Sequence, residues 1–294
     1  MSRAVSVENS DLGPLHLAST PIAVMAKFGL ATYAGLSGDD PGRTRHRDVS
    51  YSVVLSAFAR SRLLGRRELQ TIGPHEHVFL SVDQRLEEFG WRDASLCILH
   101  RVPSQYMADG IIRSSGDPAR RPDYSMYRTV VQYGVPNGGM GGLVYETPPN
   151  LNVTGRKPHF LSFTNKVYLS EGVDSYLVFL NYSVSADYVH ETEARLAFHD
   201  TDGRKVAAAS VQVPAYDFAC LRVNDVLKSA RDPGFFSVSA SSVTSSLIPL
   251  SILVSRRNGG VSVEHSHPPQ EYWMADWPLV NAMKARAAKH LFGS

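Results

Sequence analysis

Short runs of alternating hydrophobic and polar residues dominate the second half of the chain. Residues 193–199 and 234–240 alternate with period two, the pattern of strands that bury one face. Residues 247–255 form the most apolar run and are predicted to be the most buried strand. Turn residues separate these runs. The pattern predicts six or seven short strands, at the spacing of an antiparallel sandwich.

Two glycine-containing turns indicate hairpins within this array. Asp200-Thr201-Asp202-Gly203 precedes a return strand at 205–213, and Asn258-Gly259-Gly260 leads into 261–265. Glycine adopts positive φ without steric cost, so both segments are typical of tight turns. The first also resembles the start of a calcium loop. Its distal glutamate position holds Ala209, however, so we expect only a hairpin turn.

The first half of the chain carries the same order of elements, which indicates an internal duplication. Ser50-Tyr51 opens a strand-like run, as Ser175-Tyr176 does in the second half. Asn137-Gly138-Gly139 matches Asn258-Gly259-Gly260, and Pro148-Pro149 matches Pro268-Pro269. In the first copy we expect a turn at Gly65-Arg66-Arg67 and a helical piece near 84–89.

Each copy resembles an immunoglobulin-like or fibronectin-like sandwich, in strand number and turn spacing alone, over residues 48–146 and 173–272. The expected fold is therefore all-β, with two tandem antiparallel β-sandwich domains. The first domain is predicted to span 1–157, with an inserted loop at 103–124, and the second 158–294. The boundary is expected in 148–159, where prolines and glycines gather. Because one fold hosts many functions, this resemblance implies no activity.

A C-terminal α-helix is predicted over 277–291. Asp276 is suited to cap it, Pro278 fits its first turn, and basic residues follow at its end. Its narrow apolar stripe favours docking on the sandwich over a dimer contact or an acidic membrane surface.

Composition and charge limit the kinds of partner and the location that we expect. The 294 residues are 43% hydrophobic and 20% charged, which is typical of a soluble globular protein. A net charge of +2 disfavours nucleic acid as the main partner. The start lacks a secretory pattern, and no segment is apolar over the length needed for a transmembrane helix. Cys97 and Cys220 lie in apolar runs and are expected to be free, so a cytoplasmic location is predicted.

Histidine pairs are the strongest hint of chemistry. If the strand at 261–265 continues, His265 and His267 face the same side and can share one divalent transition metal, with Glu271 as the nearest third ligand. His75 and His77 form a second pair at a strand entrance. Two histidines are an incomplete ligand set. Chance pairs are also expected among eleven histidines, so a structural role is favoured for both pairs.

Other residues are candidates for contacts with a small-molecule ligand or a protein partner. They are Tyr272 and Trp273, beside the second Pro-Pro, and Arg120 and Arg121, in the inserted loop. No phosphate loop, nucleophile elbow or zinc-protease motif is present. The leading hypothesis is a non-catalytic binding or scaffolding protein that holds its ligand near the interdomain groove. The alternatives are a metal-dependent enzyme using His265 and His267, and an oligomeric subunit of a larger assembly.

Overall fold

The computed structural model describes most of two β-sandwich units. The described residues are 2–7, 18–38, 50–112, 128–146, 160–182, 188–228, 233–242 and 247–265. The first compact unit comprises Met1–Tyr133, Gly142–Asn150 and Ser183–Tyr188, and the second comprises Gly134–Gly141, Leu151–Tyr182 and Val189–Ser294. The hairpin tip Gly134–Gly141, which joins the last two strands of the first sandwich, is described below with those strands. The predicted boundary at 148–159 and the predicted helix at 277–291 lie outside the described residues.

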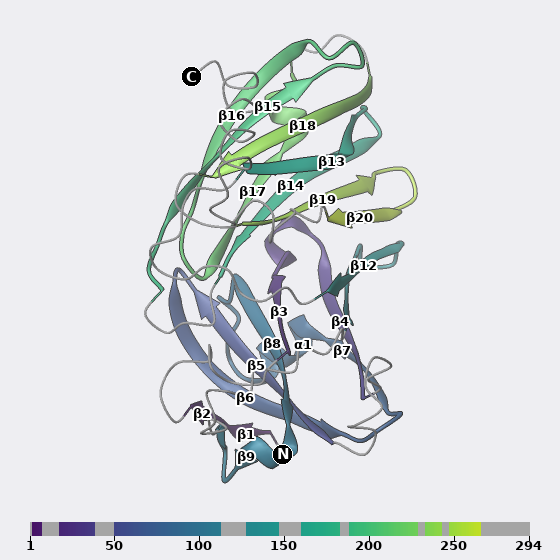
Figure 1. Ribbon diagram of the computed structural model, residues 1–294. Helices are drawn as coiled ribbons and strands as arrows, with labels where there is room; N and C mark the ends of the chain where they lie inside the picture. The colour runs from purple at the N-terminus through teal and green to yellow at the C-terminus, as the bar shows by residue number, and fades with distance from the viewer. Residues whose placement is uncertain are drawn as a thin grey trace. The chain divides into compact units, whose positions relative to one another are not determined.

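The first unit is built from two main sheets (Figure 1). One has the strand order β1-β6-β5-β8-β3, and the other β12-β11-β4-β7. The strands are β1 (Arg3–Ala4), β3 (Ala18–Ala23), β4 (Ala31–Ser37), β5 (Tyr51–Ala59), β6 (Arg62–Ile72), β7 (His77–Ser81), β8 (Leu96–Pro103), β11 (Arg128–Gly134) and β12 (Met140–Glu146). A 3-10 helix, η1 (Ala26–Phe28), joins β3 to β4, and α1 (Val82–Glu88) follows β7. A buried hydrogen bond of 2.9 Å from Thr20 Oγ1 to Thr129 Oγ1 links the two sheets.

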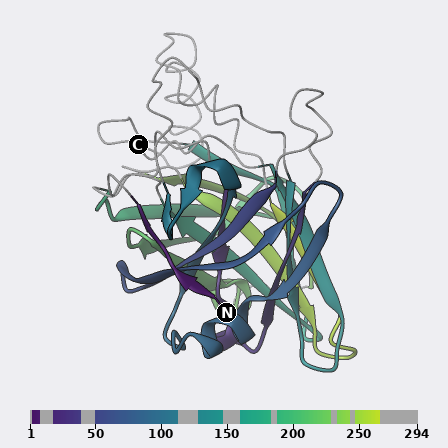
Figure 2. The same cartoon turned by 90° about the horizontal axis from the view of Figure 1, so that it is seen from below.

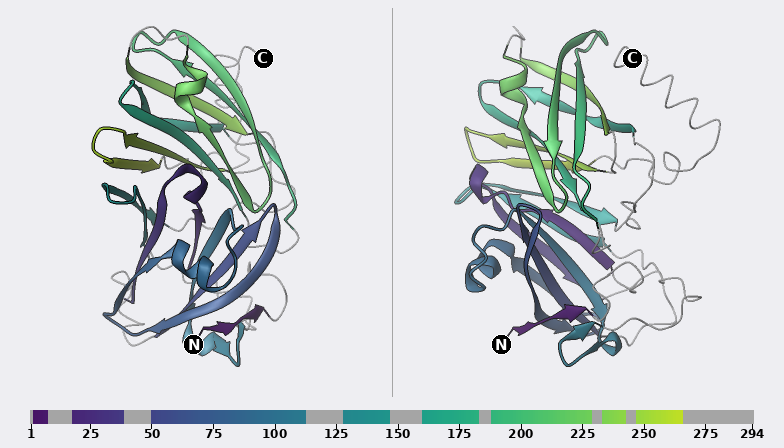
Figure 3. Two further views of the ribbon diagram at one scale, coloured as in Figure 1. Left: turned by 180° about the vertical axis from the view of Figure 1, so that it is seen from behind. Right: turned by 90° about the vertical axis from the view of Figure 1, so that its left-hand side faces the viewer.

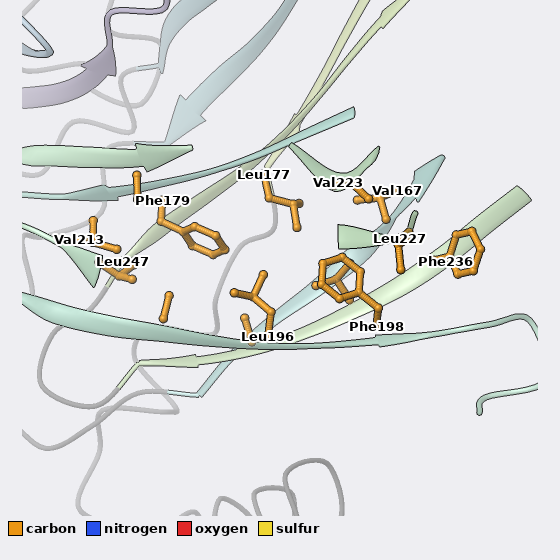
Figure 4. Packing of buried hydrophobic residues seen from close by; sticks show 14 residues of the cluster. Val167, Leu177, Phe179, Leu196, Phe198, Val213, Val223, Leu227, Phe236 and Leu247 are labelled. Atoms are coloured by element: carbon orange, nitrogen blue, oxygen red, sulfur yellow. The ribbon is translucent and has the colours of Figure 1, made fainter. Parts of the chain in front are cut away.

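The second unit repeats this plan with the strand orders β13-β18-β15-β16 and β17-β14-β19-β20. Its elements are β13 (Phe160–Leu169), β14 (Val173–Asn181), β15 (Thr192–His199), β16 (Lys205–Val213), β17 (Asp217–Arg222), α2 (Val223–Val226), β18 (Gly234–Ser242), β19 (Ile248–Ser255) and β20 (Val261–His265). Alternate residues of the facing sheets meet in one core, in which Leu177, Phe179, Leu196 and Phe198 are almost fully buried (Figure 4). The prediction of two all-β sandwiches is confirmed.

Equivalent strands follow one another in the same order in both units, as an internal duplication predicts. The order β3-β8-β5-β6 corresponds to β13-β18-β15-β16, and β7-β4-β11-β12 corresponds to β17-β14-β19-β20. The Asn-Gly-Gly segments occupy the same place, between the last two strands of each unit. The predicted match of Ser50-Tyr51 with Ser175-Tyr176 is wrong, because β5 corresponds to β15, whereas β14 corresponds to β4. The runs in β5 and β14 are similar in composition, but they belong to sheets that are not equivalent in the two units.

A shared helix contact supports this corrected correspondence. The second residue of α1, Asp83, accepts a 2.6 Å hydrogen bond from the backbone N–H of Thr32 in β4. The second residue of α2, Asn224, accepts a 2.9 Å hydrogen bond from the backbone N–H of Ser175 in β14. Both helices are visible in Figure 3. Each copy therefore uses the same side-chain position to hold its short helix against the equivalent strand.

The predicted turn at Gly65-Arg66-Arg67 is also wrong, since β6 runs through these residues. The turn lies instead at Arg60 and Ser61, which adopt φ of 49° and 66°. A Cβ at Gly65 would lie 2.5 Å from Cζ2 of Trp91. Gly65 is therefore required for the close approach of the indole, rather than for a turn.

The beginning of the inserted segment is structured. It forms the 3-10 helix η2 (Ser104–Tyr106) and the strands β9 (Met107–Ala108) and β10 (Ile111–Ile112). β10 pairs in parallel with the N-terminal β2 (Ser6–Val7), while β1 adds to the edge of β6 (Figure 2). Val5, Val54, Val102 and Ile112 form a small buried cluster there. The expectation of a plain loop is therefore wrong for 103–112, and 113–127 lie outside the described residues.

No helix in the described part of the chain is long and apolar enough to cross a membrane. Cys97 and Cys220 form no disulfide, as predicted.

Candidate functional site

A half-buried tyrosine stacked against an exposed phenylalanine marks the outer face of one sheet in the first unit. In β4, Thr32, Ala34 and Leu36 are buried, so the alternating Tyr33 and Gly35 point to the opposite face. In β7, Leu80 is buried and Phe79 points outward. The rings of Tyr33 and Phe79 stack with centroids 5.6 Å apart and planes 9° apart. Phe79 is 55% exposed, so more than half of this large apolar side chain faces solvent.

The neighbours of this pair are small or apolar. Gly35 lies directly opposite Phe79 in the β4–β7 ladder. A Cβ at Gly35 would meet Cδ2 of Phe79 and Cβ of Val130 at 3.5 Å each, so Phe79 and Val130 flank a position that carries no side chain. We call Tyr33, Gly35, Phe79 and Val130 the Tyr33–Phe79 surface. None of the four carries a charge.

The second unit does not repeat this surface. The duplicated strand order places Tyr176 at the position of Tyr33, Val178 at that of Gly35 and Cys220 at that of Phe79. Val178 is fully buried. An exposed phenylalanine at this ladder position, opposite a bare glycine, is therefore a feature of the first unit, whereas the exposed Phe235 of the second unit lies in its other sheet.

At the end of the equivalent ladder, the second unit carries an ion cluster. Asp174 of β14 accepts hydrogen bonds from Arg222 at 2.5 Å and from Arg256 at 2.6 Å. The hydrogen bond from Arg256, followed by the hydrogen bond from Arg222, lowers the pKa of Asp174 to about 2 against the cost of partial burial. The backbone N–H of Arg256 also donates to the carbonyl of Gly172 at 2.9 Å. The cluster ties β14, β17 and the β19–β20 turn together, which is a structural role.

A buried serine–histidine pair occupies the opposite sheet of the first unit. Ser56 Oγ and His100 Nε2 lie 2.8 Å apart, on adjacent strands β5 and β8, and neither residue is exposed. Burial lowers the pKa of His100 to about 3, and the positive charge of Arg66 acts in the same direction. The imidazole is therefore neutral at ordinary pH. A nucleophile needs access to a substrate, and this pair has none, so we assign it to the interior packing.

Of the predicted site residues, the structure describes His75, His77 and His265. His75 lies in the β6–β7 turn with φ of 66°, so its side chain does not follow the strand alternation that begins at His77. His265 ends β20 opposite Leu250 and is half-buried. The remaining predicted site residues lie outside the described ranges: His267, Glu271, Tyr272, Trp273, Arg120 and Arg121.

Within the ranges that the structure describes, no group of three or more His, Cys, Asp or Glu side chains is placed to hold a metal ion.

The Tyr33–Phe79 surface was missed at the level of sequence, although a signal for it exists. Phe79 occupies the same alternation as His77 and Ser81, the polar positions of its strand, while Val78 and Leu80 take the apolar positions. An aromatic residue in polar register indicates an exposed ring.

Comparisons with known proteins identify no family for this chain and give only distant structural similarities. No family model and no curated protein matches this chain. A glycosyl hydrolase family 2 member from Bacteroides cellulosilyticus is similar at 10% identity and a TM-score of 0.20, over 85% of this chain and 26% of that chain. A Bacteroides uniformis beta-glucuronidase matches at 9% identity and a TM-score of 0.19, over 84% and 25% of the two chains. This chain thus spans about a quarter of the length of either enzyme.

Proposed function

We propose that this protein is a non-catalytic binding or scaffolding protein that contacts its ligand or partner through the Tyr33–Phe79 surface. The proposal rests on Phe79, whose exposed ring stacks on Tyr33 and lies beside the bare position of Gly35. Leaving a phenylalanine 55% exposed forgoes on the order of 1 kcal/mol of burial free energy, which a bound partner would recover. The difference between the copies supports the same conclusion, because the duplicated scaffold does not require Phe79.

The chemistry of the surface favours an uncharged partner. An aromatic face and a neighbouring valine gain free energy from apolar contact, and a charged group placed there would lose hydration without a counter-charge. A Cβ at Gly35 would lie at ordinary contact distance from Phe79 and Val130, so a small group can approach the sheet there. A neutral ligand or an apolar peptide side chain fits these conditions.

A paired array screen tests the proposal. The protein is applied to an array of neutral glycans and to an array of peptides, alongside Phe79→Ala and Leu63→Ala variants. Leu63 is 37% exposed in the same unit and lies on β6, in the other sheet, so it is the matched control. We expect signals that Phe79→Ala loses and Leu63→Ala keeps. Equal signals for all three proteins, or none above background on both arrays, would contradict the proposal.

The metal-dependent alternative is tested separately, because it depends on His265 together with His267 and Glu271. We expect protein purified without a chelating tag to hold less than stoichiometric metal, and a His265→Ala, His267→Ala double variant to hold the same amount. Elemental analysis measures both. Stoichiometric metal that the double variant loses would favour the enzyme over the binding protein.

A further inference from the structure

Among the residues that the structure describes, no strand protects the edge strand β16 of the second unit as β1 protects its equivalent in the first. In the first unit, β6 is paired on its outer side by β1, with Arg3 opposite Glu68 and Ala4 opposite Arg67. In the second unit, β16 pairs with β15 on one side, and no described strand pairs with its other side. The duplication thus compares the same edge with and without a partner strand.

The sequence of β16 also lacks the features that usually prevent an edge strand from pairing with another chain. Charged side chains, prolines and bulges discourage pairing between free edges. β6 carries Arg62, Arg66, Arg67 and Glu68 along its length, whereas β16 has one charge, Lys205, at its first position, and no proline. The β15–β16 ladder is regular from Thr192 to Phe198, and its irregularity is confined to the end near His199. Eight uncharged residues therefore present a regular edge.

The side chains that β16 turns inward remain incompletely covered. Ala207, Ala209 and Val211 pack against the hydrophobic core of the second unit, yet each stays partly exposed. The alternate residues point outward and are exposed, including Val206 at 40%. A further strand at this edge would cover the inward row and complete the core at that end.

We propose that two copies of this chain associate through antiparallel pairing of their β16 edges. Directly opposed residues in an antiparallel ladder point to the same face, so inward residues must meet inward residues. A two-fold axis at Ala209 satisfies this rule, because it places Ala207 opposite Val211 and Ala208 opposite Ser210. No like charges become opposed, since Lys205 lies opposite Val213. The strand is therefore complementary to itself, which is the requirement of a closed dimer.

This interaction goes beyond the proposed binding function and uses a different unit. The inward rows of the two copies would form one continuous apolar layer across the joined sheets. The small side chains at the centre, Ala208, Ala209 and Ser210, allow the two backbones to approach to the normal strand spacing.

Sedimentation analysis of the full chain over a concentration series tests the proposal. We expect a particle of twice the 32.3 kDa chain mass that an Ala208→Lys, Ser210→Lys double variant converts to monomer. In the proposed register these substitutions oppose like charges across the axis. Ser237→Lys with Ser241→Lys is the matched control. It adds the same charges to the outward alternation of β18, an interior strand of the same sheet, and should leave the dimer intact. Circular dichroism confirms that each variant is folded.

Cysteine cross-linking provides the second readout and reports the register. The distance between opposed strand residues suits a disulfide, so Ala208→Cys with Ser210→Cys should give a covalent dimer on mild oxidation. The unsubstituted chain, with Cys97 and Cys220, is the control and should give none. A monomer at every concentration, or a dimer that the lysine pair leaves unchanged, would overturn the proposal.

Discussion

Lowering the pH from 7.5 to 5 is expected to destabilise the first unit by about 2 kcal/mol through His100 alone. Burial lowers the pKa of this imidazole to about 3, whereas in the unfolded chain it returns to its ordinary value near 6.5. Between these two values the unfolded state binds a proton that the folded state excludes. Stability contributed by the neutral histidine is therefore full above pH 6.5 and falls by about 1.4 kcal/mol per pH unit as the pH drops toward 3.

Urea unfolding at the two pH values measures this effect in the wild type and in His100→Gln. Glutamine keeps a hydrogen-bonding group near Ser56 and does not titrate, so the variant should lose about 2 kcal/mol less than the wild type between pH 7.5 and 5. His77→Gln, at an exposed strand position, is the matched control for replacing a histidine by glutamine. An identical pH dependence for His100→Gln and the wild type would show that His100 is not the group responsible.

Removing the Phe198 side chain is expected to cost about 3–5 kcal/mol of the free energy of unfolding of the second unit. Phe198 is fully buried in β15 and packs in the cluster that holds Leu177, Phe179 and Leu196 (Figure 4). Phe198→Ala removes that contact area and leaves a cavity between two sheets whose backbones are fixed by their ladders. Denaturant unfolding followed by circular dichroism measures the loss.

Phe235→Ala separates the effect of burial from that of losing a phenylalanine. Phe235 lies in the same sheet, is 51% exposed, and contacts Tyr168 with ring centroids 4.8 Å apart. Its removal should cost no more than about 1 kcal/mol. Equal losses for the two variants would mean that the Phe198 side chain does not support the core as described.

Sequence pattern predicted the second unit well, because its strands alternate and its turns are chemically explicit. In the Asp200 turn, Asp200 Oδ1 accepts hydrogen bonds from the N–H groups of Asp202 and Arg204, and Gly203 adopts φ of 77°. β13 was missed. Its ladder with β18 shifts register between Phe163 and Lys166, and such a bulge interrupts the period of two by which a strand is found. The incorrect match of Ser50-Tyr51 with Ser175-Tyr176 arises because two strands of similar sequence can belong to different sheets.

The candidate site was harder to predict than the fold, because it depends on pairing between distant strands. Phe79 stacks on Tyr33 only because β7 adds to the edge of β4, and no local pattern specifies that ladder. The histidine pairs were visible as local motifs. His75, however, lies in a turn with φ of 66°, a conformation that the local motif does not specify. Phe79 is proposed as the binding residue because the two copies do not share it, and the described start of the inserted segment packs beside the N-terminal strands.

Calorimetric titration of the strongest array ligand into wild-type, Phe79→Ala and Leu63→Ala protein measures directly whether the Tyr33–Phe79 surface binds. An aromatic anchor at the centre of a contact typically contributes more than about 1.4 kcal/mol, which is tenfold in affinity. We therefore predict that Phe79→Ala raises the dissociation constant at least about tenfold and that Leu63→Ala leaves it unchanged. A Phe79→Ala variant that binds as tightly as the wild type would contradict the assignment of this surface as the binding site.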